Sequence, residues 1–110
     1  MRRISLLAVM IVVAGLAAGV AGAARKDTSL SLVAYSTPKT VMAKIISAWQ
    51  QTPGGKGVSF STSYGPSGDQ AKAVAAGLRA DLVFLSTGDD VNTLVKAGLV
   101  APNWQSAPRL

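Results

Sequence analysis

The stretch GVSFSTSYGPSGDQAKAVAAGLRADLVFL (residues 57–85) decides the fold class, because a strand pattern, a helix pattern and a second strand pattern follow one another in it. Its first eight residues alternate between serines and mostly larger side chains, which is typical of a strand with two unlike faces. Ala71, Val74, Ala75 and Leu78 then recur at helical spacing. The nearly continuous apolar run ADLVFL (residues 80–85) predicts a parallel strand that is buried on both faces.

The same order of elements appears on both sides of this stretch. Upstream, LSLVAY (residues 30–35) predicts a strand, and Ser36-Thr37-Pro38 predicts a helix start with proline at the first helical position. The helix itself follows in KTVMAKIISAWQQ (residues 39–51), whose apolar side chains fall on one face. These side chains are Val41, Met42, Ile45, Ile46 and Trp49.

Downstream, Ser86-Thr87-Gly88-Asp89-Asp90 predicts the start of a third helix that ends before Gly98, and Gly77 is placed to end the second helix. We expect the acidic pair to stabilise the positive end of the third helix. Alternation of three strands with three helices predicts an α/β fold with a parallel sheet and right-handed crossovers.

The N-terminal segment has the features of a secretory signal peptide. Arg2 and Arg3 precede the uncharged run Ile4–Val20, and Ala21-Gly22-Ala23 fits the small-residue cleavage pattern. A retained transmembrane helix is the alternative, since about 17 apolar residues lie at the lower limit for a bilayer span. We expect residues 1–24 to be the signal peptide, residues 25–100 to form part of a ligand-binding lobe, and residues 101–110 to begin a crossover. The expected location is the periplasm.

Composition excludes several classes of function. The sequence has neither cysteine nor histidine, so disulfides and the usual transition-metal sites are not expected, and no cofactor is indicated. Removal of the signal peptide leaves nine Lys and Arg against five Asp, a formal charge of +4. These basic residues are spread singly among few aromatic ones, unlike a nucleic-acid-binding surface.

Ser67, in the turn YGPSGDQ, has three possible roles. A serine nucleophile requires a neighbouring base, and a chain without histidine lacks the usual one, so an enzyme is not expected. Ser67 with Gln70 fits a helix-capping box. The same helix start could hold an anion, because its first amides lack partners and Gly68 leaves space for an oxyanion near the backbone.

The anion hypothesis gains from a second junction of the same kind, at Ser36. In an open α/β sheet both junctions lie at the carboxyl edge of the strands, where such folds bind ligands. A fully ionised anion such as sulfate needs only donors there. Asp69 could cap its own helix or accept the proton of hydrogen phosphate, and the sequence leaves this choice open.

Three segments carry a resemblance to a known family: LSLVAYSTPKTVMAKIISAW, GKGVSFSTSYGPSGDQAKAVAAGLRADLVFLSTGDDVNTLVKAGLV and NW. In this order they resemble the N-terminal part of the periplasmic sulfate- and thiosulfate-binding proteins of ABC importers. The resemblance implies one lobe of a type II periplasmic binding protein fold, with a membrane permease as partner. It also implies that Ser67 donates to sulfate through its amide and hydroxyl, and that Ser36 donates its amide.

This sequence departs from the family at two places. Some members carry aspartate where Ser36 stands, which leaves an amide donor unchanged. The family continues into a second lobe that supplies further donors, so we expect this chain to be a truncated N-terminal portion with the second lobe absent. A protein for another oxyanion such as molybdate, and a secreted serine-dependent hydrolase, are the alternative functions.

Overall fold

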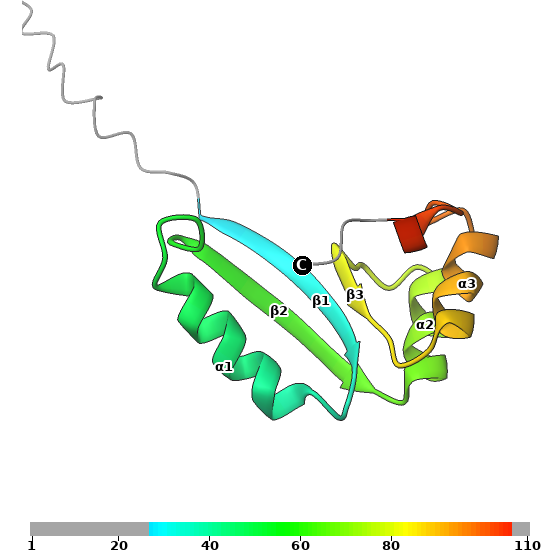
Figure 1. Cartoon of the computed structure of the whole chain (residues 1–110), viewed down its shortest axis with the longest axis horizontal. Coiled ribbons are helices and arrows are strands. Elements are labelled where there is room, and N and C mark those ends of the chain that lie inside the picture. Colours follow the sequence, from blue (N-terminus) through cyan, green and yellow to red (C-terminus); the bar gives the residue numbers. More distant parts are fainter. Residues whose placement is uncertain (1–26, 107–110) are drawn as a thin grey trace, which may run out of the picture.

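The computed structural model describes residues 27–106, which form a parallel sheet with helices on both faces (Figure 1). The elements are β1 (Thr28–Tyr35), α1 (Lys39–Gln50), β2 (Val58–Gly65), α2 (Ser67–Ala75), β3 (Leu82–Phe84), α3 (Gly88–Lys96) and the 3₁₀ turn η2 (Trp104–Ser106). The predicted order of strands and helices, and the predicted α/β class, are confirmed. The expected signal peptide lies outside the described residues.

The sheet has the strand order β2-β1-β3, and β1 pairs in parallel with both neighbours. The chain therefore moves from β1 to β2 in one direction and returns past β1 to reach β3. Because parallel crossovers are right-handed, this reversal places α1 on one face of the sheet and α2 on the other. Figure 1 shows α1 along β2, with α2 and α3 on the far side beside β3.

The core lies between the sheet and the pair α2 and α3. Val33 of β1, Val74 of α2 and Leu94 of α3 form its buried centre. Val83 of β3 packs against this centre and is the register partner of Val33. Two crossovers thus bring three distant segments into one core.

The third strand differs from its prediction. It comprises three residues, and Leu82 and Phe84 are 48% and 43% exposed. Val83 faces the core, while its two neighbours point to the other face of the sheet, where α1 lies along β2 instead. The apolar run predicted that β3 is buried on both faces, but residues 27–106 cover only one face of this strand.

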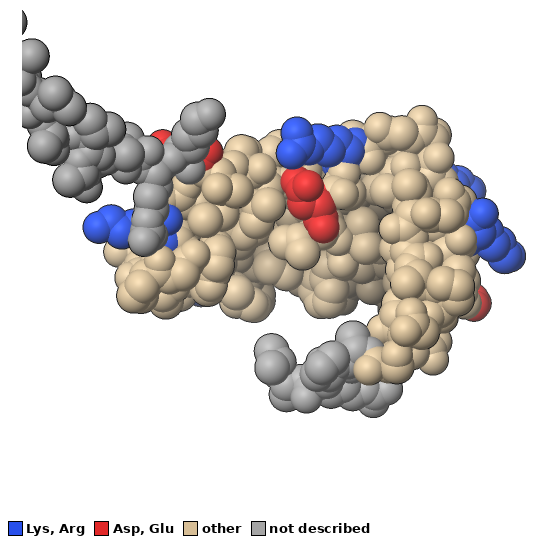
Figure 2. Space-filling view, turned by 90° about the horizontal axis from the view of Figure 1, so that it is seen from above, with Lys and Arg blue, Asp and Glu red and all other residues tan. Residues whose placement is uncertain are grey.

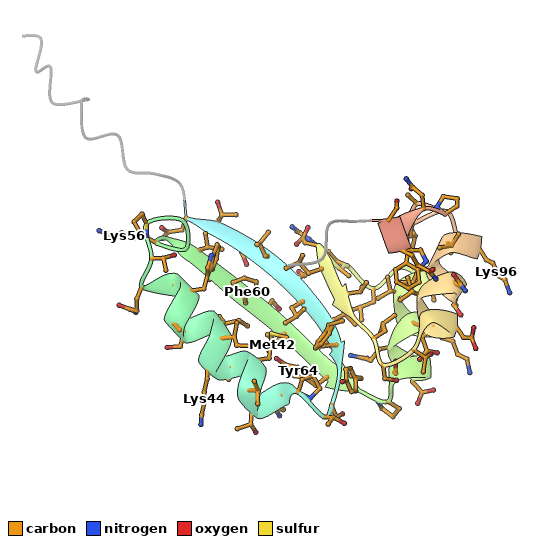
Figure 3. The ribbon with its side chains drawn as sticks, in the orientation of Figure 1. Met42, Lys44, Lys56, Phe60, Tyr64 and Lys96 are labelled. Carbon is orange, nitrogen blue, oxygen red and sulfur yellow. The ribbon has the colours of Figure 1, made fainter. Side chains whose placement is uncertain are left out.

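The first helix also differs in detail. Pro38 is its N-cap residue, so the helix begins one residue later than the proline rule predicted. Met42 and Ile46 are half-buried, whereas Val41 and Ile45 are 58% and 55% exposed. In Figure 3, Met42 and Phe60 lie between α1 and β2, and Lys44 points away from them. The helix therefore packs with only part of its predicted apolar face.

Candidate functional site

The three strands end at one edge of the sheet, and the sequence-predicted residues lie there. Tyr35 and Gly65 are register partners at the ends of β1 and β2. Ser36 follows the first of them directly, and Ser67 comes two residues after the second. Neighbouring strands are about 4.8 Å apart. The structure thus places both serines on the same edge, beyond adjacent strands.

A hydrogen bond connects the start of α2 with the end of β3. The backbone N–H of Ser86, two residues beyond β3, donates to Ser67 Oγ at 2.9 Å. Because β2 and β3 flank β1, this bond joins the segments that follow the two outer strands of the sheet. The sequence did not predict this role of Ser86, because the bond depends on strand order.

The predicted capping box is wrong. Ser67 is the first helical residue of α2, and the N-cap is Pro66, whose ring offers no acceptor. Gln70 is therefore one residue too far along the helix to reach back. It lies on the inner face with Ala71 and Val74, and all three side chains are buried.

Gln70 instead joins the two strands beneath the site. Its side-chain nitrogen donates to the carbonyl oxygens of Ala34 (3.2 Å) and Ser63 (2.9 Å) and to Ser63 Oγ (3.1 Å). Ala34 is in β1 and Ser63 is in β2, so one buried amide fixes the ends of both strands. The helical spacing of Gln70 with Ala71 and Val74 is the sequence signal that could have placed it inward.

The three helix starts differ in whether a side chain satisfies their amides. Thr87 Oγ1 caps α3 by accepting from the Asp90 N–H at 3.2 Å. The N-cap residues of α1 and α2 are Pro38 and Pro66, and proline carries no side-chain acceptor. In α1 the first amide, that of Lys39, donates instead to the carbonyl oxygen of Ser36 at 3.1 Å. The first amides of α2 have no side-chain cap and are left for another acceptor. The start of α1 follows Ser36, and the start of α2 contains Ser67.

Gly68 lies close to the start of α3. A Cβ at this position would meet Asp90 Oδ1 at 3.5 Å, which is an ordinary contact. The space that the glycine leaves on this side therefore faces a carboxylate. Asp89 and Asp90 are both in the first turn of α3, the position from which negative charge is expected to stabilise the helix. Asp69 is exposed.

The surroundings of Ser67 do not suit a nucleophile. Its hydroxyl oxygen accepts from an amide N–H, and an N–H group cannot take up the hydroxyl proton. The sequence has no histidine to act as base. On the face that Figure 2 shows, the basic side chains lie in separate small groups, one of them beside an acidic side chain, which is unlike the continuous basic stripe of a nucleic-acid surface. Within residues 27–106, no helix has the length and apolar character needed to span a membrane.

Comparisons with known proteins agree with this architecture. A family model described as bacterial extracellular solute-binding protein matches residues 30–108. A sulfate-binding protein of Synechocystis is 39% identical over 90 residues, covering 78% of this chain and 26% of that protein. A sulfate-binding protein of Synechococcus elongatus is 38% identical, covering 76% of this chain and 25% of its own length.

A solved structure gives the same result. The sulfate-binding protein SubI from Mycobacterium tuberculosis matches with a TM-score of 0.70 and 44% identity, over 73% of this chain and 28% of that one. The chain thus spans about a quarter of the length of the relatives that it matches. By name these relatives are binding proteins rather than enzymes. With its parallel sheet and its match over residues 30–108, the chain belongs to the bacterial extracellular solute-binding protein family.

Proposed function

We propose that this chain forms one side of the oxyanion site in the sulfate-binding component of an ABC importer. Ser36, Ser67 and Gly68 are the proposed ligand-binding residues, with sulfate or thiosulfate as ligand. The observation that carries the proposal is that α2, which begins at Ser67 and Gly68, has a proline N-cap and no side-chain cap for its first amides. The start of α3, which contributes no proposed ligand-binding residue, is capped by the side chain of Thr87.

The bond between Ser86 and Ser67 supports a donor role for the Ser67 hydroxyl. A hydroxyl has one proton and two lone pairs. Since Ser67 Oγ already accepts from the Ser86 amide, its proton is available for a second acceptor. Sulfate is an acceptor only, so a helix start with unsatisfied amides and a hydroxyl donor matches its chemistry.

Sulfate is favoured over protonated oxyanions by the same reasoning. Hydrogen phosphate needs an acceptor for its proton. Asp90, whose carboxylate faces Gly68, is in the first turn of α3, where it stabilises the start of that helix. Asp69 is the acidic residue in the first turn of α2. Its side chain is exposed, which favours a role in stabilising the helix start over a role in the site. Molybdate, which is also a doubly charged acceptor, is the remaining alternative for the ligand.

The proposal places the protein in the periplasm and gives it a membrane permease as partner. Residues 1–24 would be the signal peptide, residues 25–100 the first part of the ligand-binding lobe, and residues 101–110 the start of a crossover. The matched region is about a quarter of the length of each relative. Further donors would therefore come from polypeptide beyond this quarter, and domain closure would exclude water from the anion.

A hybrid protein tests the proposal. In this hybrid protein, residues 27–106 replace the matched region of the Mycobacterium tuberculosis sulfate-binding protein. We expect calorimetry to show micromolar sulfate binding. Loss of a hydrogen bond to a charged group costs about 1.5–3 kcal/mol, so Ser67→Ala should weaken binding by roughly 10- to 150-fold.

Ser47→Ala is the matched control, because Ser47 is an exposed serine in the middle of α1. Equal affinities of the Ser67→Ala and Ser47→Ala proteins would contradict the proposed role of Ser67. Competition with molybdate separates the two ligands. Turnover of model esters by the hybrid protein, lost in Ser67→Ala, would instead support a hydrolase.

A further inference from the structure

The basic side chains of the described chain are divided unevenly between the two edges of the sheet. A helix that follows a parallel strand begins at the carboxyl edge and ends at the amino edge. Lys44 is in the middle of α1 and points away from the sheet (Figure 3). Within residues 27–106, Lys39 at the start of α1 is the one basic residue at the carboxyl edge. The others precede a strand or lie in the last turn of a helix, toward the amino edge: Lys56, Lys72, Arg79 and Lys96.

Three acidic residues share the carboxyl edge with Lys39. Asp69 is in the first turn of α2, and Asp89 and Asp90 are in the first turn of α3. The first turn of α1 contains no acidic residue. Negative charge at this edge repels an approaching dianion. Lys39 is thus the described side chain that can offset this repulsion beside the proposed site.

Lys39 is placed against the preference of its own helix. The N-terminus of a helix carries partial positive charge, so a lysine in the first turn is unfavourable for α1. Natural proteins break such local rules mainly at functional sites. The placement of Lys39 therefore favours a functional role for its charge over a stabilising one.

Two contacts keep Lys39 close to the proposed site. Its backbone N–H donates to the carbonyl oxygen of Ser36 at 3.1 Å, so a single turn of chain joins the two residues. Its ammonium nitrogen lies 5.8 Å from the centroid of the Tyr64 ring, within the limit of about 6 Å for a cation–π interaction. Tyr64 is the penultimate residue of β2, beside the strand end that leads to Ser67. The charge is therefore held between the end of β2 and the start of α1.

We propose that Lys39 attracts the doubly charged oxyanion to the site at Ser36 and Ser67 through space, without being one of its ligands. This inference rests on the proposed function, because it assumes that the site binds an anion. A unit charge about 10 Å from a dianion in water changes the affinity by roughly fourfold. Such an attraction reaches about 30 Å at 0.01 M ionic strength and about 3 Å at 1 M, whereas a buried contact is screened much less. Salt dependence therefore distinguishes attraction at a distance from a ligand contact.

Calorimetry on the hybrid protein at two ionic strengths tests the role of Lys39. We expect Lys39→Gln to weaken sulfate binding roughly fourfold at about 0.01 M ionic strength, and less than about 1.5-fold at about 1 M. Lys39→Arg keeps the charge and should keep the affinity. Lys44→Gln is the matched control, because Lys44 is exposed on the same helix and the substitution changes the net charge equally.

Two results in this assay would overturn the inference. A loss of affinity in Lys39→Gln that persists at the higher ionic strength would mean that Lys39 touches the anion. An equal loss in Lys39→Gln and Lys44→Gln, or no loss in either, would mean that the position of the charge has no effect.

A thiol placed at the site measures the attraction without sulfate. The sequence has no cysteine, so Ser36→Cys in the full 110-residue chain gives a single thiol. Its rates are compared for two methanethiosulfonate reagents, one carrying a sulfonate and one neutral. Both reagents react with the same thiolate, so the ratio of their rates reports the local potential. We expect adding Lys39→Gln to lower the ratio of the anionic to the neutral rate about twofold at low ionic strength, and adding Lys44→Gln to leave it unchanged.

The two assays separate this inference from the proposed function. A lowered ratio in Lys39→Gln, together with a hybrid protein that fails to bind sulfate, keeps the attraction of anions by Lys39 and counts against the proposed function. An unchanged ratio refutes the role of Lys39 even if the hybrid protein binds sulfate tightly.

Discussion

At the scale of single residues, Gln70 is the side chain on which the geometry of the proposed site depends most. It is 8% exposed and bonds to backbone oxygens of both β1 and β2 directly below their carboxyl ends. Gln70→Ala leaves these groups without their donor. The cost of such a buried loss is about 1–3 kcal/mol, and we expect urea unfolding of the hybrid protein to show a decrease of that size in its free energy of unfolding.

The control is Gln51→Ala, because Gln51 is exposed at the C-terminal end of α1. We expect it to change stability by less than about 0.5 kcal/mol. If the two substitutions had the same effect, the amide of Gln70 would not be holding the strands together.

At the scale of elements, glycines with positive φ follow the ends of α2 and α3. After α2, Gly77 has φ of +115° and donates to the carbonyl oxygen of Val74 at 3.0 Å, and Leu78 donates to that of Ala73 at 2.9 Å. This pair of bonds is a Schellman motif, which a residue with a Cβ disfavours. We expect Gly77→Ala to destabilise the hybrid protein by about 1–2 kcal/mol in thermal or urea unfolding.

Gly54→Ala is the control that separates the effect of a positive φ from the effect of a steric contact. A Cβ at either Gly54 or Gly77 would meet no atom within 4 Å, so neither substitution creates a clash. Gly77 has a positive φ and Gly54 is outside the positive-φ glycines. A loss of stability in Gly54→Ala as large as that in Gly77→Ala would refute the assignment to φ.

At the scale of the whole molecule, the described chain presents donors from one side only. Ser36, Ser67 and the starts of α1 and α2 lie at one exposed edge of the sheet, where water competes for the same anion. Charge interactions weaken in water and strengthen when it is excluded. We therefore expect the 110-residue chain, exported and purified alone, to bind sulfate at least ~100-fold more weakly than the hybrid protein in calorimetry.

Micromolar sulfate binding by the chain alone would disprove this expectation and would mean that one edge of the sheet suffices. Nitrate at the same ionic strength is the control ligand. It distinguishes a site for a doubly charged oxyanion from general attraction of anions to a chain of net positive charge.

Much of the fold could be read from local signals. The alternation in VSFSTSY and the helical spacing of Ala71 and Val74 predicted β2 and α2, because side-chain period follows directly from backbone conformation. Gly77 and Gly98 ended their helices as predicted, because both have positive φ. The position of Ser36 and Ser67 at one edge of the sheet also followed, since parallel strands end together.

Only the tertiary structure decided which faces are covered and which side chains meet. The exposure of Leu82 and Phe84, the inward position of Gln70 and the bond from Ser86 to Ser67 all depend on the order β2-β1-β3. Strand order joins residues far apart in the sequence, and local hydrophobic period carries no information about it. The sequence by itself therefore determined the elements and their polarity, while packing of distant segments determined the shape of the site and the exposure of β3.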